Sequence, residues 1–90
     1  MYRIEVSKNV AKFLKKHPDL RKKILYVFEE IKSSPISVIS TKKFDISSLT
    51  GLPNYYRLRK GKYRVIFEIK NDKLIIFLVK ADSRGEVYKK

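Results

Sequence analysis

The stretch Asn54–Arg64 constrains the fold of this chain more than any other. Apolar and charged side chains alternate up to Lys60-Gly61 and alternate again beyond it, a pattern typical of a tight β-hairpin. With these two residues as the loop, the predicted cross-strand pairs are Arg59 with Lys62, Leu58 with Tyr63, Arg57 with Arg64, and Tyr56 with Val65. Successive side chains of a strand point to opposite faces. One face of the hairpin is therefore predicted to meet a core, and the other to carry Arg57, Arg59, Lys62 and Arg64.

This cationic face is unfavourable for a sheet, because like charges directly opposite one another destabilise strand pairing. Cations that are held together usually bind a polyanion, and guanidinium groups match phosphate oxygens with two parallel hydrogen bonds. No acidic residue lies between Asp45 and Glu68 to neutralise the cations. We therefore expect a phosphate-binding surface, with a merely solvated basic face as the alternative.

The composition also favours an anionic partner. The chain has 90 residues, enough for a single domain spanning 1–90, and its 22 Lys and Arg against 9 Asp and Glu give a formal net charge of +13. Such a charge predicts an acidic partner, which is nucleic acid, an acidic protein or, as the weakest of the three, an anionic membrane surface. No apolar run approaches the roughly 20 residues that span a bilayer, and the N-terminus lacks the pattern of a signal peptide. We expect a cytoplasmic protein.

The sequence has few side chains that could bind a metal through nitrogen or sulfur, and none that could carry out thiol chemistry. There is no cysteine, and His17 is the only histidine. A disulfide framework, a cysteine nucleophile and a multi-histidine metal site are therefore excluded. We expect no cofactor and no metal, and we assign His17 no role.

Upstream of the hairpin, the periodicity predicts a strand followed by two helices. Residues 2–6 alternate between apolar and charged, as in a strand with one buried face. Ser7 is a suitable N-cap for a short helix that ends at His17-Pro18, because the residue before a proline avoids the α region. Pro18-Asp19 then opens a second helix, and Ser33-Ser34-Pro35 ends it. Its apolar stripe is Leu20, Ile24, Val27, Phe28 and Ile31.

The remaining segments complete an α+β fold. Residues 36–53 follow no clear period and are predicted to form a loop, with a short strand near Lys43–Asp45 and a turn at Leu49–Gly51. After the hairpin, the unbroken apolar run Leu74–Val79 is typical of a central strand covered on both faces. The predicted order is β-α-α-β-β-β, with the helices packed on a small, mostly antiparallel sheet.

Several of these features together resemble one known family. The chain has the leading strand, the helical hairpin, a Leu-Thr-Gly turn, the run Tyr55-Tyr56-Arg57-Leu58-Arg59-x-Gly61-x-Tyr63-Arg64 and the closing Arg84-x-Glu86-Val87-Tyr88. Over essentially its whole length it is similar to the RelE toxins of bacterial and archaeal toxin–antitoxin systems. The resemblance implies a ribosome-dependent endoribonuclease that cleaves mRNA in the A site and inhibits translation. It also implies an acidic RelB-like antitoxin as partner, with operator DNA bound only through that antitoxin.

The resemblance also assigns roles to residues. The two basic positions of the family's first hairpin strand correspond to Arg57 and Arg59, and the arginine after the turn tyrosine corresponds to Arg64. The arginine before the final Glu-Val-Tyr corresponds to Arg84, and the terminal tyrosine corresponds to Tyr88. Some family members carry lysine at the first two positions and a longer helix after the tyrosine. This sequence ends two residues after Tyr88, so we expect its tail to contribute less to ribosome or antitoxin contacts.

These residues suit cleavage of RNA by its own 2′-oxygen. Arginines can stabilise the charge that develops on the phosphate, but they stay protonated and so cannot serve as the base. Tyr88 is then the candidate base, since surrounding guanidinium groups would lower the pKa of its phenol. We expect Arg64 and Arg84 to bind the scissile phosphate, and Arg57 and Arg59 to bind the flanking phosphates or to act as weak proton donors. The further RNA-binding candidates are Lys60, Lys62 and Tyr55, whose ring lies on the cationic face and can stack on a base.

Other interpretations stay open at this point. Tyr88 can simply pack on the sheet, and Arg84 can pair with Glu86 or Asp82. A ParE-like toxin of the same fold that inhibits DNA gyrase is a second function, although the arginine–tyrosine set would then have no role. A non-catalytic RNA- or ribosome-binding protein is a third, and only the closing motif argues against it.

Overall fold

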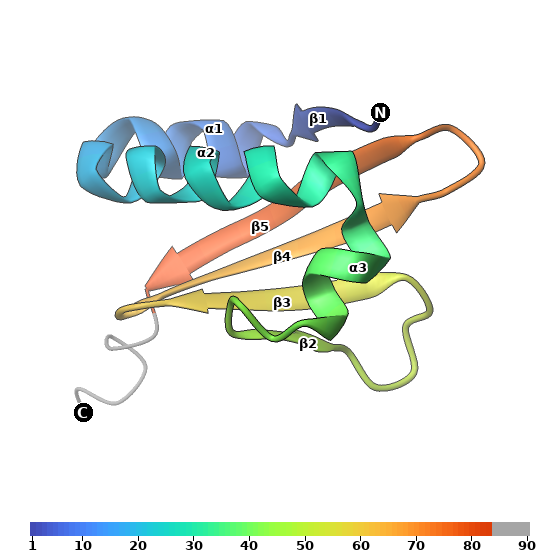
Figure 1. Cartoon of the computed structure of the whole chain (residues 1–90). Helices are drawn as coiled ribbons and strands as arrows, with labels where there is room; N and C mark the ends of the chain where they lie inside the picture. The colour runs from blue at the N-terminus through green and yellow to red at the C-terminus, as the bar shows by residue number, and fades with distance from the viewer. Residues whose placement is uncertain (84–90) are drawn as a thin grey trace.

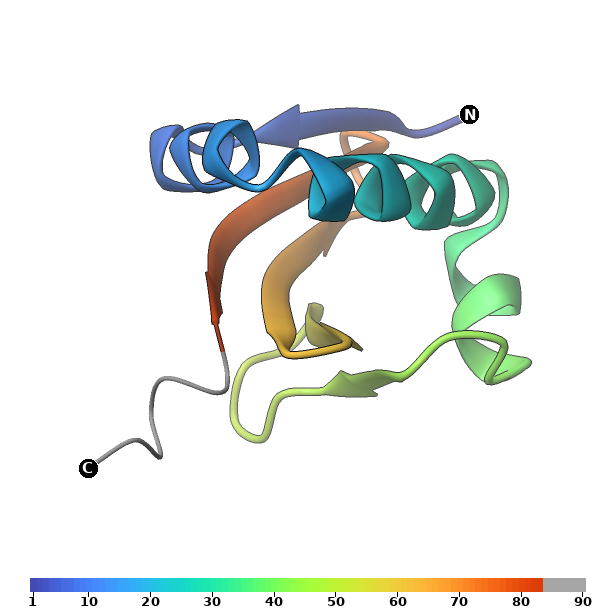
Figure 2. The same ribbon diagram turned by 90° about the vertical axis from the view of Figure 1, so that its left-hand side faces the viewer.

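The computed structural model describes residues 1–83, which form one curled sheet with helices on one of its faces (Figures 1 and 2). The elements in chain order are β1 (Arg3–Val6), α1 (Lys8–Lys16), α2 (Pro18–Ser33), α3 (Pro35–Ser40), β2 (Ile46–Ser48), β3 (Tyr55–Lys60), β4 (Tyr63–Lys70) and β5 (Ile75–Ser83). This arrangement confirms the predicted α+β fold. It differs from the predicted order β-α-α-β-β-β by a third helix, α3, and by the short strand β2, which that order does not count.

The sheet has the strand order β1-β5-β4-β3-β2. The pair β1–β5 is parallel and the other neighbours are antiparallel, so the sheet is mostly antiparallel as predicted. In Figure 2, α1 and α2 lie on the same side of the sheet. The core fills the space between, where the rings of Phe28 and Phe67 meet edge to face with centroids 5.0 Å apart. We call this face of the sheet the inner face and the opposite one the outer face.

Helices α1 and α2 begin and end where the sequence predicts. The backbone N–H of Val10 donates to the hydroxyl of Ser7 at 3.1 Å, which caps the first turn of α1. His17 separates the two helices, and its ring packs against Phe13 and Tyr63 at centroid distances of 4.3 Å and 5.2 Å. His17 therefore closes one end of the core.

The predicted loop at residues 36–53 is wrong in two places. Pro35 starts the short helix α3, whose Val38 and Ile39 pack against the core, and six residues are too few for a helical period to appear in the sequence. The short strand is Ile46–Ser48 rather than Lys43–Asp45. The predicted turn at Leu49–Gly51 is confirmed, since the N–H of Leu52 donates to the carbonyl of Leu49 at 3.3 Å.

Strand β5 was predicted to be covered on both faces, and this is wrong. It is an interior strand between β1 and β4, but the helices cover only its inner face. Phe77 on the outer face is only half-buried, with the Lys70 ammonium 5.1 Å from its ring centroid. Within residues 1–83, no helix covers the outer face of the sheet.

The hairpin β3–β4 forms as predicted, but its loop is Gly61-Lys62 instead of Lys60-Gly61. Gly61 has a φ of +60°, and a glycine with positive φ at the first central position is typical of a type II′ turn. The observed pairs include Leu58 with Val65 and Arg59 with Arg64. Moving the loop by one residue changes each pairing partner by two, so every paired side chain keeps its predicted face.

A β-bulge at Val79 interrupts the pairing of β4 with β5. Phe67 pairs with Leu78, whereas the preceding Ile66 pairs with Lys80, so Val79 has no partner on β4. The segment around α1 supports the bulge: the Ser7 hydroxyl donates to the Val79 carbonyl at 2.7 Å, and the N–H of Ala81 donates to Asn9 Oδ1 at 3.1 Å. The bulge reverses the alternation of β5, because Leu78 and Ala81 both face the core. Lys80 and Asp82 consequently project from the outer face.

Candidate nucleic-acid interface

The outer face gathers basic side chains from three adjacent strands. Arg57 and Arg59 lie on β3, Arg64 on β4 and Lys80 on β5. Arg59 is directly opposite Arg64, and Arg57 shares a cross-strand row with Ile66 and Lys80. The predicted cationic face is confirmed for these three arginines, but only one pair of like charges is directly opposed instead of two.

Acidic side chains from flanking segments partly neutralise this surface. Asp82 on β5 accepts two hydrogen bonds from Arg64, from Nε at 3.0 Å and from Nη2 at 3.3 Å. Asp45, just before β2, brings Oδ2 to 3.4 Å from Nε of Arg59. That contact is an ion pair without the alignment of a hydrogen bond, since Arg59 Nε has no hydrogen-bond partner within the described residues. The prediction that no acidic residue neutralises the patch is therefore wrong.

Neighbouring residues restrain the side chains of Arg57 and Arg59 on β3. Arg57 Nη2 donates to Ser47 Oγ of β2 at 3.4 Å, while its Nε is buried without a hydrogen-bond partner in residues 1–83. Both residues are half-buried, and the Arg59 side chain is 40% exposed, so the aliphatic parts pack on the sheet and the charged ends reach the surface. Side chains fixed in this way lose little conformational freedom when they bind an anion.

The two lysines near the turn lie elsewhere. Lys62 is in the turn, exposed, with its ammonium 5.6 Å from the ring centroid of Tyr63. It is not on the cationic face, contrary to the prediction, because the loop is shifted by one residue. Lys60 ends β3 opposite Tyr63, on the inner face. Both lysines are at the tip of the hairpin, where they can reach a ligand only around its edge.

Tyr55 lies on the outer face, as predicted, and is paired with Glu68. The carboxylate of Glu68 raises the pKa of the Tyr55 phenol by its charge, and desolvation and a hydrogen bond to Glu68 raise it further. Tyr55 therefore stays neutral at physiological pH and can serve as a stacking surface rather than as a base. Tyr56 and Tyr63 pack against the core, as predicted.

Sequence reasoning missed Lys80, Asp82, Asp45 and Ser47. Strict alternation along β5 would turn Lys80 and Asp82 toward the core, and only the bulge at Val79 brings them outward. The polar character of both residues after an apolar run is the signal that could have revealed the bulge. Arg84 and Tyr88, two of the predicted catalytic residues, lie outside the described residues.

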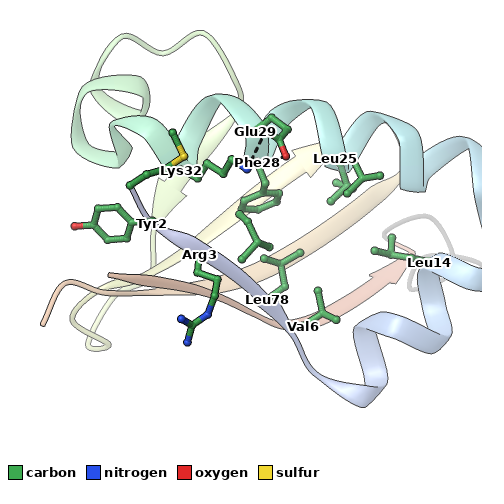
Figure 3. A pocket seen from close by; sticks show the side chains of 12 residues that line it. Tyr2, Arg3, Val6, Leu14, Leu25, Phe28, Glu29, Lys32 and Leu78 are labelled. Atoms are coloured by element: carbon green, nitrogen blue, oxygen red, sulfur yellow. Dashed lines mark hydrogen bonds and ion pairs between the residues drawn. The ribbon is translucent and has the colours of Figure 1, made fainter. Parts of the chain in front are cut away.

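A second surface feature is an apolar groove of about 380 Å³ between β1, α1 and α2. Figure 3 shows Leu25 and Phe28 of α2, Leu14 of α1 and Val6 of β1 around it, with the ion pair of Lys32 and Glu29 at its rim. Met1, Val6 and Leu25 expose 83%, 45% and 49% of their surface. The groove lies on the helix side of the sheet, whereas the cationic residues project from the outer face, and its lining suits an apolar partner segment.

Residues 1–83 contain no cluster of three or more His, Cys, Asp or Glu side chains that could hold a metal ion. None of the helices in this part of the chain is both long and apolar enough to cross a membrane.

Comparison with known proteins places this geometry in a family. The chain is 37% identical to RelE1 of Methanocaldococcus jannaschii over 89 residues, which cover 98% of this chain and 96% of that protein. It is 27% identical to the mRNA interferase toxin RelE of Escherichia coli over 66 residues, or 69% of this chain and 70% of the other. A scan against models of protein families finds no match.

Solved structures agree with the sequence relatives. The RelB–RelE antitoxin–toxin complex from Methanococcus jannaschii contains a chain with 33% sequence identity and a TM-score of 0.71, covering 93% of this chain and 94% of that one. The fold, the hairpin and the near-complete coverage thus lead to one assignment: this chain belongs to the RelE family of toxins.

Proposed function

We propose that this protein is the toxin of a type II toxin–antitoxin system and acts as a ribosome-dependent endoribonuclease that cleaves mRNA in the A site. The observation that carries the proposal is the outer face, where Arg57, Arg59 and Arg64 project together from two paired strands. These side chains are half-buried and restrained by their neighbours, and their guanidinium groups can bind the phosphates of an RNA backbone. The Escherichia coli relative, named an mRNA interferase toxin, supports RNA as the substrate.

The chemistry we propose is attack of a ribose 2′-oxygen on the adjacent phosphorus. The bond from O2′ to phosphorus forms and the bond from phosphorus to O5′ breaks, which leaves a 2′,3′-cyclic phosphate and a 5′-hydroxyl. The phenolate form of Tyr88 accepts the 2′-hydroxyl proton and becomes the neutral phenol, and the leaving O5′ gains a proton from water or from a cationic side chain. No metal takes part in this scheme, and the sequence has no cysteine and a single histidine to serve as metal ligands.

The arginines stabilise the phosphate while its charge develops. Arg59 and Arg64 are directly opposite each other in the β3–β4 register, so they project from the outer face as neighbours. We therefore propose that Arg64, with Arg84, binds the scissile phosphate, that Arg59 supports them, and that Arg57 and Lys80 bind neighbouring phosphates. Lys60, Lys62 and Tyr55 would contact RNA at the margins. With no histidine on this face, the scheme depends on the ribosome to position the substrate.

The antitoxin is the second proposed partner. Solved relatives are complexes of RelE with RelB, and a chain of net charge +13 attracts an acidic segment. We propose that an amphipathic helix of the antitoxin places apolar side chains in the groove between β1, α1 and α2 (Figure 3). An acidic segment of the same antitoxin would then cover the outer face.

Primer extension on a short mRNA tests the proposed activity. The mRNA is presented on programmed ribosomes with an empty A site, and naked RNA is the control. We expect cleavage within the A-site codon only with ribosomes, and 2′,3′-cyclic phosphate on the upstream product. An uncut message on ribosomes would refute the nuclease, and a DNA gyrase supercoiling assay would then test the ParE-like alternative.

A further inference from the structure

We propose that Asp82 is a positioning residue for RNA cleavage, acting through the guanidinium of Arg64. This inference rests on the proposed nuclease function and adds a residue to its site. An acidic side chain in a phosphate-binding surface lowers the attraction for RNA, so its presence needs another explanation. The geometry of the Arg64–Asp82 pair provides one.

The pair is formed by two parallel hydrogen bonds between directly opposed strand residues. Arg64 Nε and Nη2 donate to Asp82 Oδ1 and Oδ2 at 3.0 Å and 3.3 Å, and Arg64 is paired with Asp82 in the β4–β5 register. The side chains are 31% and 36% exposed, so the pair is shielded on its inner side. Two-point pairing fixes the plane of a guanidinium as well as its position, which a single contact does not.

The bulge at Val79 is what places Asp82 beside Arg64. Without the extra residue, the alternation that turns Ile76 and Leu78 inward would turn Asp82 into the core as well. The bulge is itself held from α1, through the bonds of Ser7 to Val79 and of Asn9 to Ala81. These two hydrogen bonds restrain the backbone of β5 just before Asp82, as a group that orients another requires.

A positioning role and a plain charge effect predict opposite results when Asp82 loses its charge. If Asp82 only reduced the positive potential, Asp82→Asn would strengthen RNA binding and cleavage would be unchanged or faster. If Asp82 orients Arg64, the same variant would bind at least as tightly but cleave more slowly. A displacement of about 1 Å at a reacting centre can cost on the order of 100-fold in rate, so we expect a loss of roughly 10- to 100-fold.

The experiment compares wild type, Asp82→Asn and the matched control Asp72→Asn on programmed ribosomes. Asp72 lies in the exposed turn before β5, so its variant removes the same charge away from the outer face. Single-turnover cleavage gives the rate of the chemical step. Binding is measured with an mRNA that has 2′-deoxyribose in the A-site codon and so cannot be cut. Asp82→Glu, Arg64→Ala and the double variant Arg64→Ala/Asp82→Asn complete the set.

We expect Asp82→Asn to slow single-turnover cleavage 10- to 100-fold with unchanged or tighter ribosome binding, and Asp72→Asn to match wild type. In the Arg64→Ala background, Asp82→Asn should have no further effect, because the group through which it acts is gone. Asp82→Glu, which keeps the carboxylate, should cleave faster than Asp82→Asn. These four results together support the proposal.

Several results would overturn it. Wild-type cleavage by Asp82→Asn would remove the positioning role and leave the nuclease intact. An equal loss of binding and cleavage, or a further loss in the Arg64→Ala background, would show that Asp82 acts on folding or directly on RNA. If wild type itself fails to cut the ribosome-bound message, the proposed function fails, and this inference fails with it.

Discussion

Ser7→Ala tests how firmly α1 holds the bulged part of β5. The Ser7 hydroxyl makes two contacts at once: it accepts from the N–H of Val10 at 3.1 Å and donates to the carbonyl of Val79 at 2.7 Å. Loss of an N-cap costs about 1 kcal/mol, and loss of a hydrogen bond costs about 1 kcal/mol more. We therefore expect the free energy of unfolding to fall by about 2 kcal/mol. A domain of this size has roughly 5–13 kcal/mol, so the variant still folds.

Urea unfolding followed by circular dichroism measures this loss, and thermal unfolding should show a midpoint roughly 8–16 °C lower. Ser40→Ala is the control, because Ser40 donates a single exposed hydrogen bond to the carbonyl of Ser37 at 3.1 Å. The control should lie within about 0.5 kcal/mol of wild type. If Ser7→Ala unfolds at the same urea concentration as Ser40→Ala, Ser7 neither caps α1 nor supports the bulge to a measurable extent.

Two other predictions concern the turn and the outer face. Gly61→Ala should lower the free energy of unfolding, measured in urea, by about 1 kcal/mol, because an L-residue is strained at the φ of +60° that Gly61 adopts. A steric clash would add nothing to this loss, since no atom lies within 4 Å of the position of the added Cβ. Unchanged stability would refute the turn geometry. Glu68→Gln should lower the pKa of Tyr55, because the Glu68 carboxylate raises that pKa. A pH titration followed by the ultraviolet absorbance of the phenolate measures the change, and Glu5→Gln is the control. The pKa of Tyr55 is raised by folding, so its contribution to stability is complete below its unfolded pKa of about 10 and is lost as the pH rises through the folded pKa. Glu68→Gln should weaken that alkaline loss, and an unchanged titration would contradict the contact.

The sequence predicted the faces of the hairpin better than its register. Alternation alone separates Leu58 and Val65 from the arginines, because the pleat has a period of two residues. The position of the loop depends on the backbone of one glycine, and placing Gly61 first in the turn instead of second shifts every pair without exchanging the faces. Pattern reasoning therefore found the cationic surface while assigning Lys62 to it wrongly.

The parts that could not be predicted depend on contacts between distant segments. Helix α3 is a turn and a half long and is stabilised by the packing of Val38 and Ile39 on the core. The bulge at Val79 depends on Ser7, 72 residues earlier in the chain. Because the bulge decides that Asp82 faces outward, the partner of Arg64 was not visible in the sequence. Tertiary contacts of this kind override local periodicity.

A comparison of two charge-removing variants tests the central claim, that RNA is bound and cut on the outer face, most directly. Arg57→Gln removes one charge from this face, and Arg21→Gln removes one from the exposed side of α2. Both are assayed by single-turnover cleavage on programmed ribosomes at two salt concentrations. We expect Arg57→Gln to lose at least 10-fold in cleavage and Arg21→Gln to stay within about twofold of wild type, since removal of a charge-assisted contact costs about 1.5–3 kcal/mol. Equal cleavage by the two variants would contradict the assignment of the outer face as the RNA-binding and catalytic surface.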